Sequence, residues 1–486
     1  MSAITESRRR WLALFVVCLA MLMNVLDLTV VNVALPKIQH DLHFTQAGLA
    51  WVIDAYMVAF GGFLLMSGRL GDLIGRKKVF LVGLAIFTAA SLVCGIASSQ
   101  GVLIGARFVQ GLAGSLSTSV ILAIIATEFT DATERAKAMS AYIFVAVGGG
   151  SIGLVAGGLI TQALNWHWIF FINLPIGAVA LALGALLVRE NAGIGWRQGV
   201  DVLGSLLVTG GLMLLVYAIV KSTEYGLGSL HTLGFGGLAL ALLAGFMVLE
   251  SRLRNPIMPL RIFAVRGLMS SSVIRACLFV GMYGVFFLGT LYLEHVLGYG
   301  ALRTGLAFLP MTLVVAVMSI GVTARLVTAF GPRRVALPGI LCVVAAVAML
   351  SQISANGSYF PLMFFAFALM GLGMGSASVP LLGLAMAHVP AKDAGLASGV
   401  VNVSMQVAGA LGVAILSTIA TDRSKTLSGL HHTLASALTG GYQLAFIAAA
   451  GAAVAAFLLA VTIVRAPRRA QEEPAREPAG TARAEA

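Results

Sequence analysis

A few ionisable residues of this 486-residue chain lie inside long apolar runs. An ionised side chain is costly in such surroundings, so these residues are candidates for a functional role. They are Asp27, Asp54, Arg107 and Arg275, with Glu294 near the end of a run. An ionised side chain at a bilayer centre costs roughly 2.5–3.5 kcal/mol on insertion scales. At a rise of about 1.5 Å per residue, Asp27, Asp54 and Arg107 lie at a similar depth. Two acids and one base leave a net negative charge, which suits coupled binding of protons and a monovalent cation. For Asp54 the alternative is an interfacial position at a frayed helix start.

The composition places these runs in a membrane. Of all residues, 59% are hydrophobic and only 10% are charged, and the mean hydropathy is +0.97. A soluble domain carries about 25% charged residues. A soluble enzyme, a nucleic-acid-binding domain and a disordered protein are therefore excluded. We assign the net charge of +12 to cytoplasmic loops rather than to nucleic-acid binding.

The four cysteines lie far apart inside apolar runs and form no CxxC pair. We interpret them as small core hydrophobes, and we expect neither a metal site nor a cofactor. They are Cys18, Cys94, Cys277 and Cys342.

Apolar runs bounded by charged residues, Pro or Gly predict fourteen transmembrane helices. The first run is too long for a cleaved signal peptide. Most of the 31 Lys and Arg residues fall in loops on one side, so both termini are expected in the cytoplasm of a plasma-membrane protein. The predicted spans are 11–34, 49–70, 79–98, 102–126, 138–162, 169–188, 201–221, 232–250, 268–293, 304–328, 334–353, 359–387, 396–420 and 441–464.

A weak internal repeat organises these spans into two halves. The segment GRLGDLIGRK at 68–77 is similar to ARLVTAFGPR at 324–333, and both follow the second span of a set. Repeated halves are typical of secondary transporters. We expect an all-α polytopic membrane protein whose parts are a cytoplasmic N-terminus 1–10, a six-helix half 11–188, an inserted helix pair 201–250, a second six-helix half 268–464 and a disordered cytoplasmic tail 465–486.

Four stretches together resemble the major facilitator superfamily, and within it the fourteen-span drug:proton antiporters. They are GRLGDLIGRKK (Gly68–Lys78), LDLTVVNVALP (Leu26–Pro36), RFVQG (Arg107–Gly111) and WHWIFFINLPIG (Trp166–Gly177). The resemblance covers nearly the whole chain outside both tails. It implies that the acid of the first span, Asp27, and the arginine of the fourth, Arg107, line a central cavity and handle substrate and protons. Acids in the first two spans, here with Asp54, are a feature of exporters of quaternary ammonium cations.

The segment Gly68–Lys78 is interpreted as a gate loop on the cytoplasmic side. Its glycines permit tight turns and close helix approach, and its single acid can form a charge-assisted network with the basic residues around it. In the family such a network latches the outward-open state; the alternative is a loop that merely sets topology. The second copy has Thr328 in place of the acid. The residues concerned are Gly68, Arg69, Asp72, Gly75 and Arg76.

The fifth span carries a glycine frame similar to the antiporter motif of the family. Its glycines are Gly149, Gly153, Gly157 and Gly158, and Leu154 stands where the motif has proline. Small residues allow close packing of membrane helices.

Polar and aromatic residues within spans are candidates for the substrate cavity, although packing against helices or lipid is the alternative for each aromatic residue. Asn32 and Gln110 are favoured, because buried amides in membrane helices need partners. The candidates are Asn24, Asn32, Gln110, Tyr142, Asn173, Tyr283, Phe286, Phe287, Asn402 and Gln406.

These features predict a secondary transporter that exports amphipathic, cationic drugs in exchange for protons, with no nucleic-acid partner and compatible with a monomer. A proton-coupled transporter of an endogenous metabolite or lipid is the alternative. A polytopic membrane enzyme is disfavoured, because the eight His residues lie in loops or at span ends and no HExxH occurs. The phosphate-binding GxxxxGK[ST] loop is absent, which excludes an ATPase motor on this chain.

Overall fold

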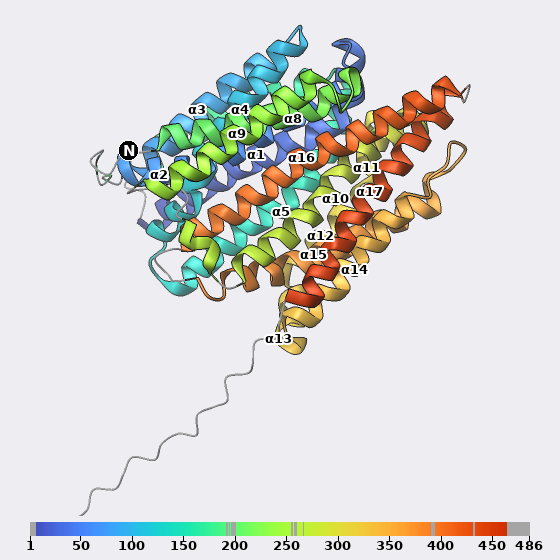
Figure 1. Ribbon diagram of the computed structural model, residues 1–486. Helices are drawn as coiled ribbons and strands as arrows, with labels where there is room; N and C mark the ends of the chain where they lie inside the picture. The colour runs from blue at the N-terminus through green and yellow to red at the C-terminus, as the bar shows by residue number, and fades with distance from the viewer. Residues whose placement is uncertain are drawn as a thin grey trace, which may run out of the picture.

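The computed structural model describes residues 6–463 except 191–192, 194, 196–200, 254–255, 257–259, 266, 390–393 and 431–432. The tail 465–486, for which disorder was predicted, lies outside the described residues. Every regular element among the described residues is a helix, and the helices form one elongated bundle (Figure 1). Helices dominate because lipid cannot hydrogen-bond the backbone, so each span must satisfy its own N–H and C=O groups.

The first seven α-helices, which we name the N-terminal set, cover the region of the first six predicted spans. A short 3-10 helix, Gly48–Ala50, leads directly into α2. Ser99 caps α4 by accepting a hydrogen bond from the backbone N–H of Val102 at 3.4 Å. The set consists of α1 (Glu6–Asp41), α2 (Trp51–Ile74), α3 (Arg76–Gly95), α4 (Gln100–Glu128), α5 (Ala132–Ala163), α6 (Trp168–Phe171) and α7 (Asn173–Leu187).

Two helices, α8 (Val202–Tyr225) and α9 (Leu230–Arg252), follow and pack against each other. The remaining helices are named the C-terminal set. Its members are α10 (Leu268–His295), α11 (Ala301–Ala307), α12 (Leu309–Val317), α13 (Thr323–Phe330), α14 (Pro332–Leu350), α15 (Phe364–Met386), α16 (Ala394–Gly429) and α17 (Leu434–Ile463), with short helices at Leu260–Ala264, Met318–Val322 and Tyr359–Met363.

Twelve helices of the described part are long and apolar enough to cross a membrane. Two of the fourteen predicted spans, 138–162 and 304–328, are not among the twelve. The first corresponds to α5, in which the described apolar stretch is only Ile152–Ala163. The second is divided into α11, α12 and α13, with a kink at Gly321, whose φ is 150°. The described residues therefore give an all-helical membrane fold with twelve candidate spans.

The two sets contact each other through a few helix pairs. α2 packs on α16, α5 packs on α11 and α12, and α1 contacts α10. The helix α8 contacts both α2 and α16, so the α8–α9 pair lies beside the seam between the sets. At this seam Thr418 of α16 donates a hydrogen bond to the carbonyl of Ile219 at 3.3 Å.

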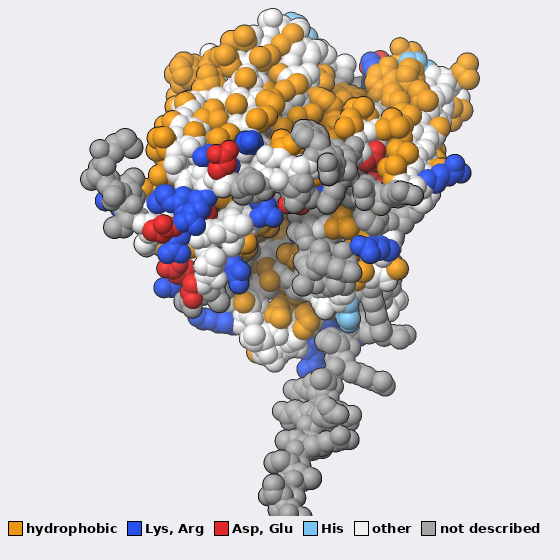
Figure 2. Space-filling view, turned by 90° about the vertical axis from the view of Figure 1, so that its left-hand side faces the viewer, with side chains coloured by type: hydrophobic (Ala, Val, Ile, Leu, Met, Phe, Trp, Pro, Cys, Tyr) orange, Lys and Arg blue, Asp and Glu red, His pale blue; other side chains and the backbone are white. Residues whose placement is uncertain are grey.

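Charge and hydrophobicity separate on the molecular surface. Lys and Arg side chains gather on the end of the bundle near the N-terminus, whereas hydrophobic side chains dominate the sides of the helices (Figure 2). Large apolar residues are widely exposed on those sides; Leu186, for example, is 73% exposed. Exposed apolar area of this extent needs lipid rather than water as its neighbour.

Candidate transport site

The carboxylate of Asp27 is the centre of a buried polar network in the N-terminal set. Its side chain is 1% exposed. It forms an ion pair with Arg107, whose Nη1 donates to Asp27 Oδ2. Its other oxygen, Oδ1, accepts hydrogen bonds from Gln110 Nε2 and from Asn173 Nδ2, both at 3.1 Å. Helices α1, α4 and α7 thus meet at one carboxylate, which joins four residues that the sequence analysis named.

Arg107 is held in place by more than its ion pair. Its Nε donates to the carbonyl of Val52 at 2.9 Å, and its Nη1 also donates to Gln110 Oε1 at 2.9 Å. Its guanidinium carbon lies 4.6 Å from the ring centroid of Tyr56, in cation–π geometry. The side chain is fully buried. A buried charge of this kind is tolerated because it is paired and hydrogen-bonded.

Three members of the network were not predicted as site residues. Ser91 Oγ accepts a hydrogen bond from Gln110 Nε2 at 2.8 Å, and Cys94 Sγ donates to Gln110 Oε1 at 3.2 Å. Tyr56 donates to Asn24 Oδ1 at 3.2 Å and so brings in Asn24. Cys94 is buried as the sequence analysis expected, but it also forms this polar contact. A spacing of three residues places Ser91 and Cys94 on one face of α3, and that spacing was the available signal.

Glycines of α4 allow the helices to approach closely enough for these contacts. A Cβ at Gly111 would collide with the backbone carbonyl of Tyr56 in α2. A Cβ at Gly114 would lie 2.8 Å from both Asn24 Oδ1 and the Tyr56 hydroxyl. The segment from Arg107 to Gly114 therefore combines the polar residues of the network with the small residues that make room for it.

Asp54 lies outside this network. It is fully buried, and neither of its carboxylate oxygens has a hydrogen-bond partner among the described residues. It shares one face of α2 with Met57 and Gly61, three and seven residues further on. That face packs on α16, because Met57 lies against Gly409 and the Cα of Gly61 faces the side chain of Gln406. Helical periodicity therefore directs Asp54 to the seam between the two sets, away from Arg107.

Two further candidates meet at the same seam. The hydroxyl of Tyr283 in α10 donates to Gln406 Oε1 in α16 at 3.1 Å. The ring of Tyr283 also lies against Gly409, next to Met57 of α2. These contacts bring the predicted residues Tyr283 and Gln406 together between the sets.

The remaining cavity candidates are dispersed. Asn32 bonds only the carbonyl of Leu28 in its own helix at 2.7 Å, and Asn402 is exposed and bonds the carbonyl of Ser398. Tyr142 donates to the sulfur of Met21 at 3.6 Å. Phe286 and Phe287 are buried packing residues; the ring of Phe286 lies 5.3 Å from that of Phe308.

The segment predicted as a gate loop is mostly helical. α2 continues through Gly68, Arg69 and Asp72 to Ile74, and α3 begins at Arg76. Gly75 alone links them with a φ of 104°, a conformation that favours glycine. The acid Asp72 pairs with Arg76 at 3.2 Å, one turn away. The repeated segment behaves alike, because Gly331 links α13 to α14 with a φ of 85°.

The glycine frame of α5 packs against both sets. Gly149, Gly153 and Gly157 face α1, where a Cβ on Gly157 would lie 2.9 Å from the Cα of Val30. Gly158 faces α11, where a Cβ would lie 2.7 Å from the carbonyl oxygen of Ala301. Leu154, at the position of the motif proline, is buried, and its carbonyl lies against Gly305 of α11. The frame thus makes close helix contacts at the α1–α5–α11 junction.

Comparison with known proteins decides what kind of protein carries this site. A family model described as Major Facilitator Superfamily matches residues 17–413. The chain belongs to the Major Facilitator Superfamily. Its residues align at 37% identity over 471 positions with the puromycin resistance protein of Streptomyces alboniger, covering 96% of this chain and 93% of that protein. The cephamycin export protein of Amycolatopsis lactamdurans is 34% identical over 460 residues, covering 93% and 91%.

Solved structures agree with the superfamily fold. A bacterial homologue of the human lysosomal transporter Spinster, in an inward-facing and unoccupied conformation, matches with a TM-score of 0.67. The match has 16% identity and covers 94% of this chain and 98% of that one, so it speaks for the fold alone. Membership of the superfamily makes the chain a transporter rather than an enzyme, and a multi-pass protein of the cell membrane.

Proposed function

We propose that this chain is a secondary exporter of amphipathic, cationic drugs that moves its substrate outward in exchange for protons. The relatives named for resistance to puromycin and for export of cephamycin support drug export. The buried and unpartnered carboxyl of Asp54 supports a preference for cations and a coupling to protons.

The proposal includes fourteen membrane crossings, with both termini in the cytoplasm. At about 1.5 Å per residue, the 32 residues of α5 span roughly 48 Å, more than the bilayer core needs. The helices α11 to α13 supply the other crossing across their kink. An even number of crossings places both termini on the same side. The gathering of Lys and Arg at the end near the N-terminus favours the cytoplasm for that side.

The observation that carries the proton coupling is the unpartnered carboxyl of Asp54. An ionised carboxylate without partners is costly in an apolar interior, and protonation removes that cost. Asp54 therefore fits this packed α2–α16 seam with its proton bound. Separation of the seam would admit water, release the proton and leave an anion that can hold a cationic drug.

Asp27 takes a different part in this cycle. It is an ion-paired anchor that fixes α1, α4 and α7 around Arg107. In the proposed cycle a proton from outside reaches Asp54 and weakens its hold on the drug, which is released. The protonated, drug-free transporter then returns to the cytoplasmic side. The hydrogen bonds of Asp27 hold α1, α4 and α7 together while the seam between the two sets opens and closes.

Transport in inside-out membrane vesicles tests the proposal with two related probes, the monovalent cation ethidium and the divalent cation propidium. We expect wild-type protein to accumulate both when a proton gradient is imposed. Asp54→Asn should lose propidium transport and should make any remaining ethidium transport independent of the proton gradient, because the substitution removes one negative charge and the proton site together. Asp422→Asn, which removes an exposed carboxylate of α16, is the matched control.

Two results would count against the function. Accumulation that is unaffected by collapse of the proton gradient would exclude proton exchange. Full gradient-driven transport of both cations by the Asp54→Asn protein would remove Asp54 from the coupling mechanism.

A further inference from the structure

The guanidinium of Arg275 is buried in the C-terminal set without an anion beside it. The residue is 7% exposed and lies about two turns from the start of α10. Its Nη2 contacts the sulfur of Met405 in α16 at 3.1 Å. Its Nε and Nη1 have no hydrogen-bond partner among the described residues. A thioether is a weak acceptor, so it does not replace a counter-ion.

A second unpartnered polar group lies on the same helix face. Ser272 precedes Arg275 by three residues, which places the two on one side of α10. Its side chain is 2% exposed, and its Oγ likewise has no partner within the described part of the chain. Ser272 Oγ and the Nε and Nη1 groups of Arg275 are thus buried hydrogen-bond donors on one side of α10 that lack an acceptor among the described residues.

The chain itself offers no acid to this pair from the described residues of the C-terminal set. The acids there are Glu294 and Asp422. Glu294 lies 19 residues further along α10, about 28 Å away. Asp422 lies 17 residues beyond Met405 along α16, about 25 Å away. Among the described residues of its own set, the positive charge of Arg275 therefore has no carboxylate within reach.

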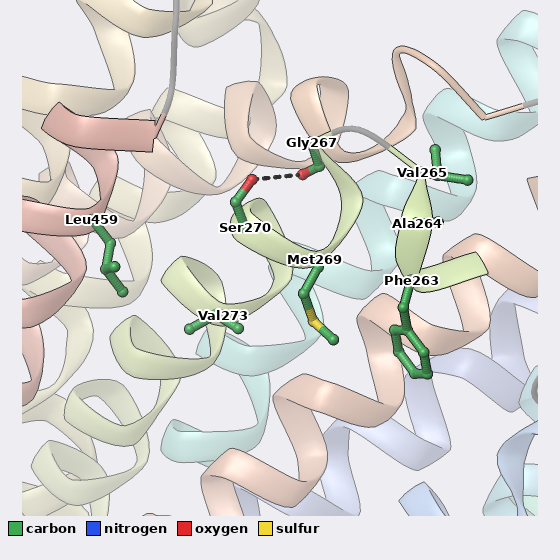
Figure 3. A pocket seen from close by; sticks show the side chains of 8 residues that line it. All are labelled: Phe263, Ala264, Val265, Gly267, Met269, Ser270, Val273 and Leu459. Carbon is green, nitrogen blue, oxygen red and sulfur yellow. Dashed lines mark hydrogen bonds between the residues drawn. The ribbon is translucent and has the colours of Figure 1, made fainter. Parts of the chain in front are cut away.

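Arg275 does not face the lipid side of α10. That side is marked by a surface groove to which Met269, Ser270 and Val273 contribute, with Leu459 of α17 across from them (Figure 3). Arg275 does not line this groove and contacts α16 instead. Gln406, the next residue after Met405, bonds Tyr283 at the seam between the sets. The guanidinium therefore faces the interior of the C-terminal set, between α10 and α16.

We propose that Arg275 and Ser272 form a binding subsite for an anionic oxygen group, a carboxylate or a phosphate carried by an amphipathic molecule. A guanidinium binds such groups with two parallel hydrogen bonds, one from Nη2 and one from Nε or Nη1. In Arg275 both Nε and Nη1 are free, and Nη2 meets only a weak thioether acceptor that an anionic oxygen can replace. The subsite rests on the proposed export function and extends its range from cations to zwitterions and acids. A bound anionic group would supply the negative charge that the guanidinium of Arg275 lacks among the described residues.

Two rhodamines that differ in a single group test this subsite. Rhodamine 110 carries a free carboxylate, and rhodamine 123 is its methyl ester. Binding of each to the purified full-length protein is measured by fluorescence polarisation. We expect Arg275→Gln to weaken rhodamine 110 binding by about tenfold, as loss of a charge-assisted hydrogen bond does. Rhodamine 123 binding should stay within about twofold. Arg303→Gln, which removes an exposed arginine of α11, is the matched control.

Two more conservative substitutions keep the subsite testable if the Arg275→Gln protein does not fold. Arg275→Lys keeps the charge but loses the two-pronged geometry, and Ser272→Ala removes one hydroxyl. Both should weaken rhodamine 110 binding several-fold and leave rhodamine 123 binding unchanged. Equal effects on the two dyes, or no effect on either, in these two variants would overturn the proposal.

An experiment with lipid vesicles distinguishes the two sources of the anionic group, which are a lipid phosphate and a transported acid. Wild-type and Arg275→Gln proteins are reconstituted in phosphatidylcholine vesicles with and without phosphatidylglycerol, and thermal unfolding is followed. If stabilisation by phosphatidylglycerol disappears in the variant while the dyes behave alike, a lipid phosphate is the ligand. If only rhodamine 110 binding falls, the ligand is a transported acid. If wild-type protein binds neither dye, the proposed multidrug function fails, and the vesicle experiment alone then tests the subsite. In that case equal stabilisation of wild-type and Arg275→Gln protein by phosphatidylglycerol would overturn the subsite.

Discussion

In the N-terminal set the buried carboxylate of Asp27 accepts hydrogen bonds from three side chains, whereas in the C-terminal set the buried guanidinium of Arg275 contacts only the sulfur of Met405 among the described residues. Both residues lie in the first long helix of their set. Asp27 thus has its counter-ion and its hydrogen-bond donors within its own set. Arg275 has no counter-ion among the described residues of the C-terminal set.

This difference separates residues that hold the fold from residues that are free to bind. A polar network that bonds side chains of several helices to one another rigidifies those helices. The network around Asp27 does so although Arg107 Nη2 and Asn173 Oδ1 have no partner among the described residues. A buried polar group that lacks partners costs free energy in the folded state, and a ligand or proton can remove that cost. Asp54 belongs to the second class although it lies in the N-terminal set. The free groups, Asp54 at the seam and Arg275 between α10 and α16, are therefore the places where a proton or a ligand can change the molecule.

The largest expected effect comes from breaking the network of the N-terminal set. Asp27→Asn leaves Arg107 buried without an anion, which typically costs about 3–5 kcal/mol. We expect gradient-driven transport of every substrate to be abolished and the thermal unfolding temperature to fall. Unfolding of purified protein and uptake by inside-out vesicles measure the two effects.

A double variant separates stability from mechanism in this test. Asp27→Asn combined with Arg107→Gln removes both charges and should recover much of the lost stability, because no unpaired charge remains. Transport should stay absent. Normal pH-driven transport by the single Asp27→Asn variant would contradict the role that we assign to the ion pair.

The matching change in the C-terminal set should have the opposite sign for stability. Arg275→Met replaces a buried charge without a counter-ion by an apolar side chain of similar length. Because no partner is stranded, the free energy of unfolding should stay the same or rise by about 1 kcal/mol. Thermal unfolding in detergent without added anionic lipid measures it. A loss as large as that of Asp27→Asn would mean that Arg275 supports the fold rather than a ligand.

Much of the fold follows from the sequence because lipid imposes one structural solution on long apolar runs. Helices occur at every predicted span, and the contact between Asp27 and Arg107 agrees with the similar depth predicted for the two residues. Depth arithmetic places residues along the membrane normal. It does not tell which way a side chain points around its helix.

The orientation of Asp54 was missed for this reason. The prediction grouped it with Asp27 and Arg107 by depth, and depth does not show that its helix face packs on α16. Knowledge of the neighbouring helix was needed, and one sequence does not supply it. The gate segment was missed differently: hydropathy ends a span at the first charges, whereas α2 continues past Arg69 and Asp72 until Gly75. Charged side chains can extend from a helix end into the headgroup region without ending the helix.

The smallest effect should come from the edge of the N-terminal network. Cys94 donates only a weak hydrogen bond to Gln110 Oε1, and that oxygen also accepts from Arg107. In Cys94→Ala the amide oxygen keeps its charged donor, so no buried acceptor is stranded. We expect a loss of about 1 kcal/mol of unfolding free energy, from the missing sulfur contact and a small cavity, and near-normal transport. Gln110→Ala provides the contrast, because it strips Asp27 and Arg107 of one partner each and should lower both stability and transport. If Cys94→Ala abolished transport while the protein stayed folded, the network would be part of the transport pathway itself, and the distinction between a self-satisfied N-terminal set and a ligand-binding seam would fail.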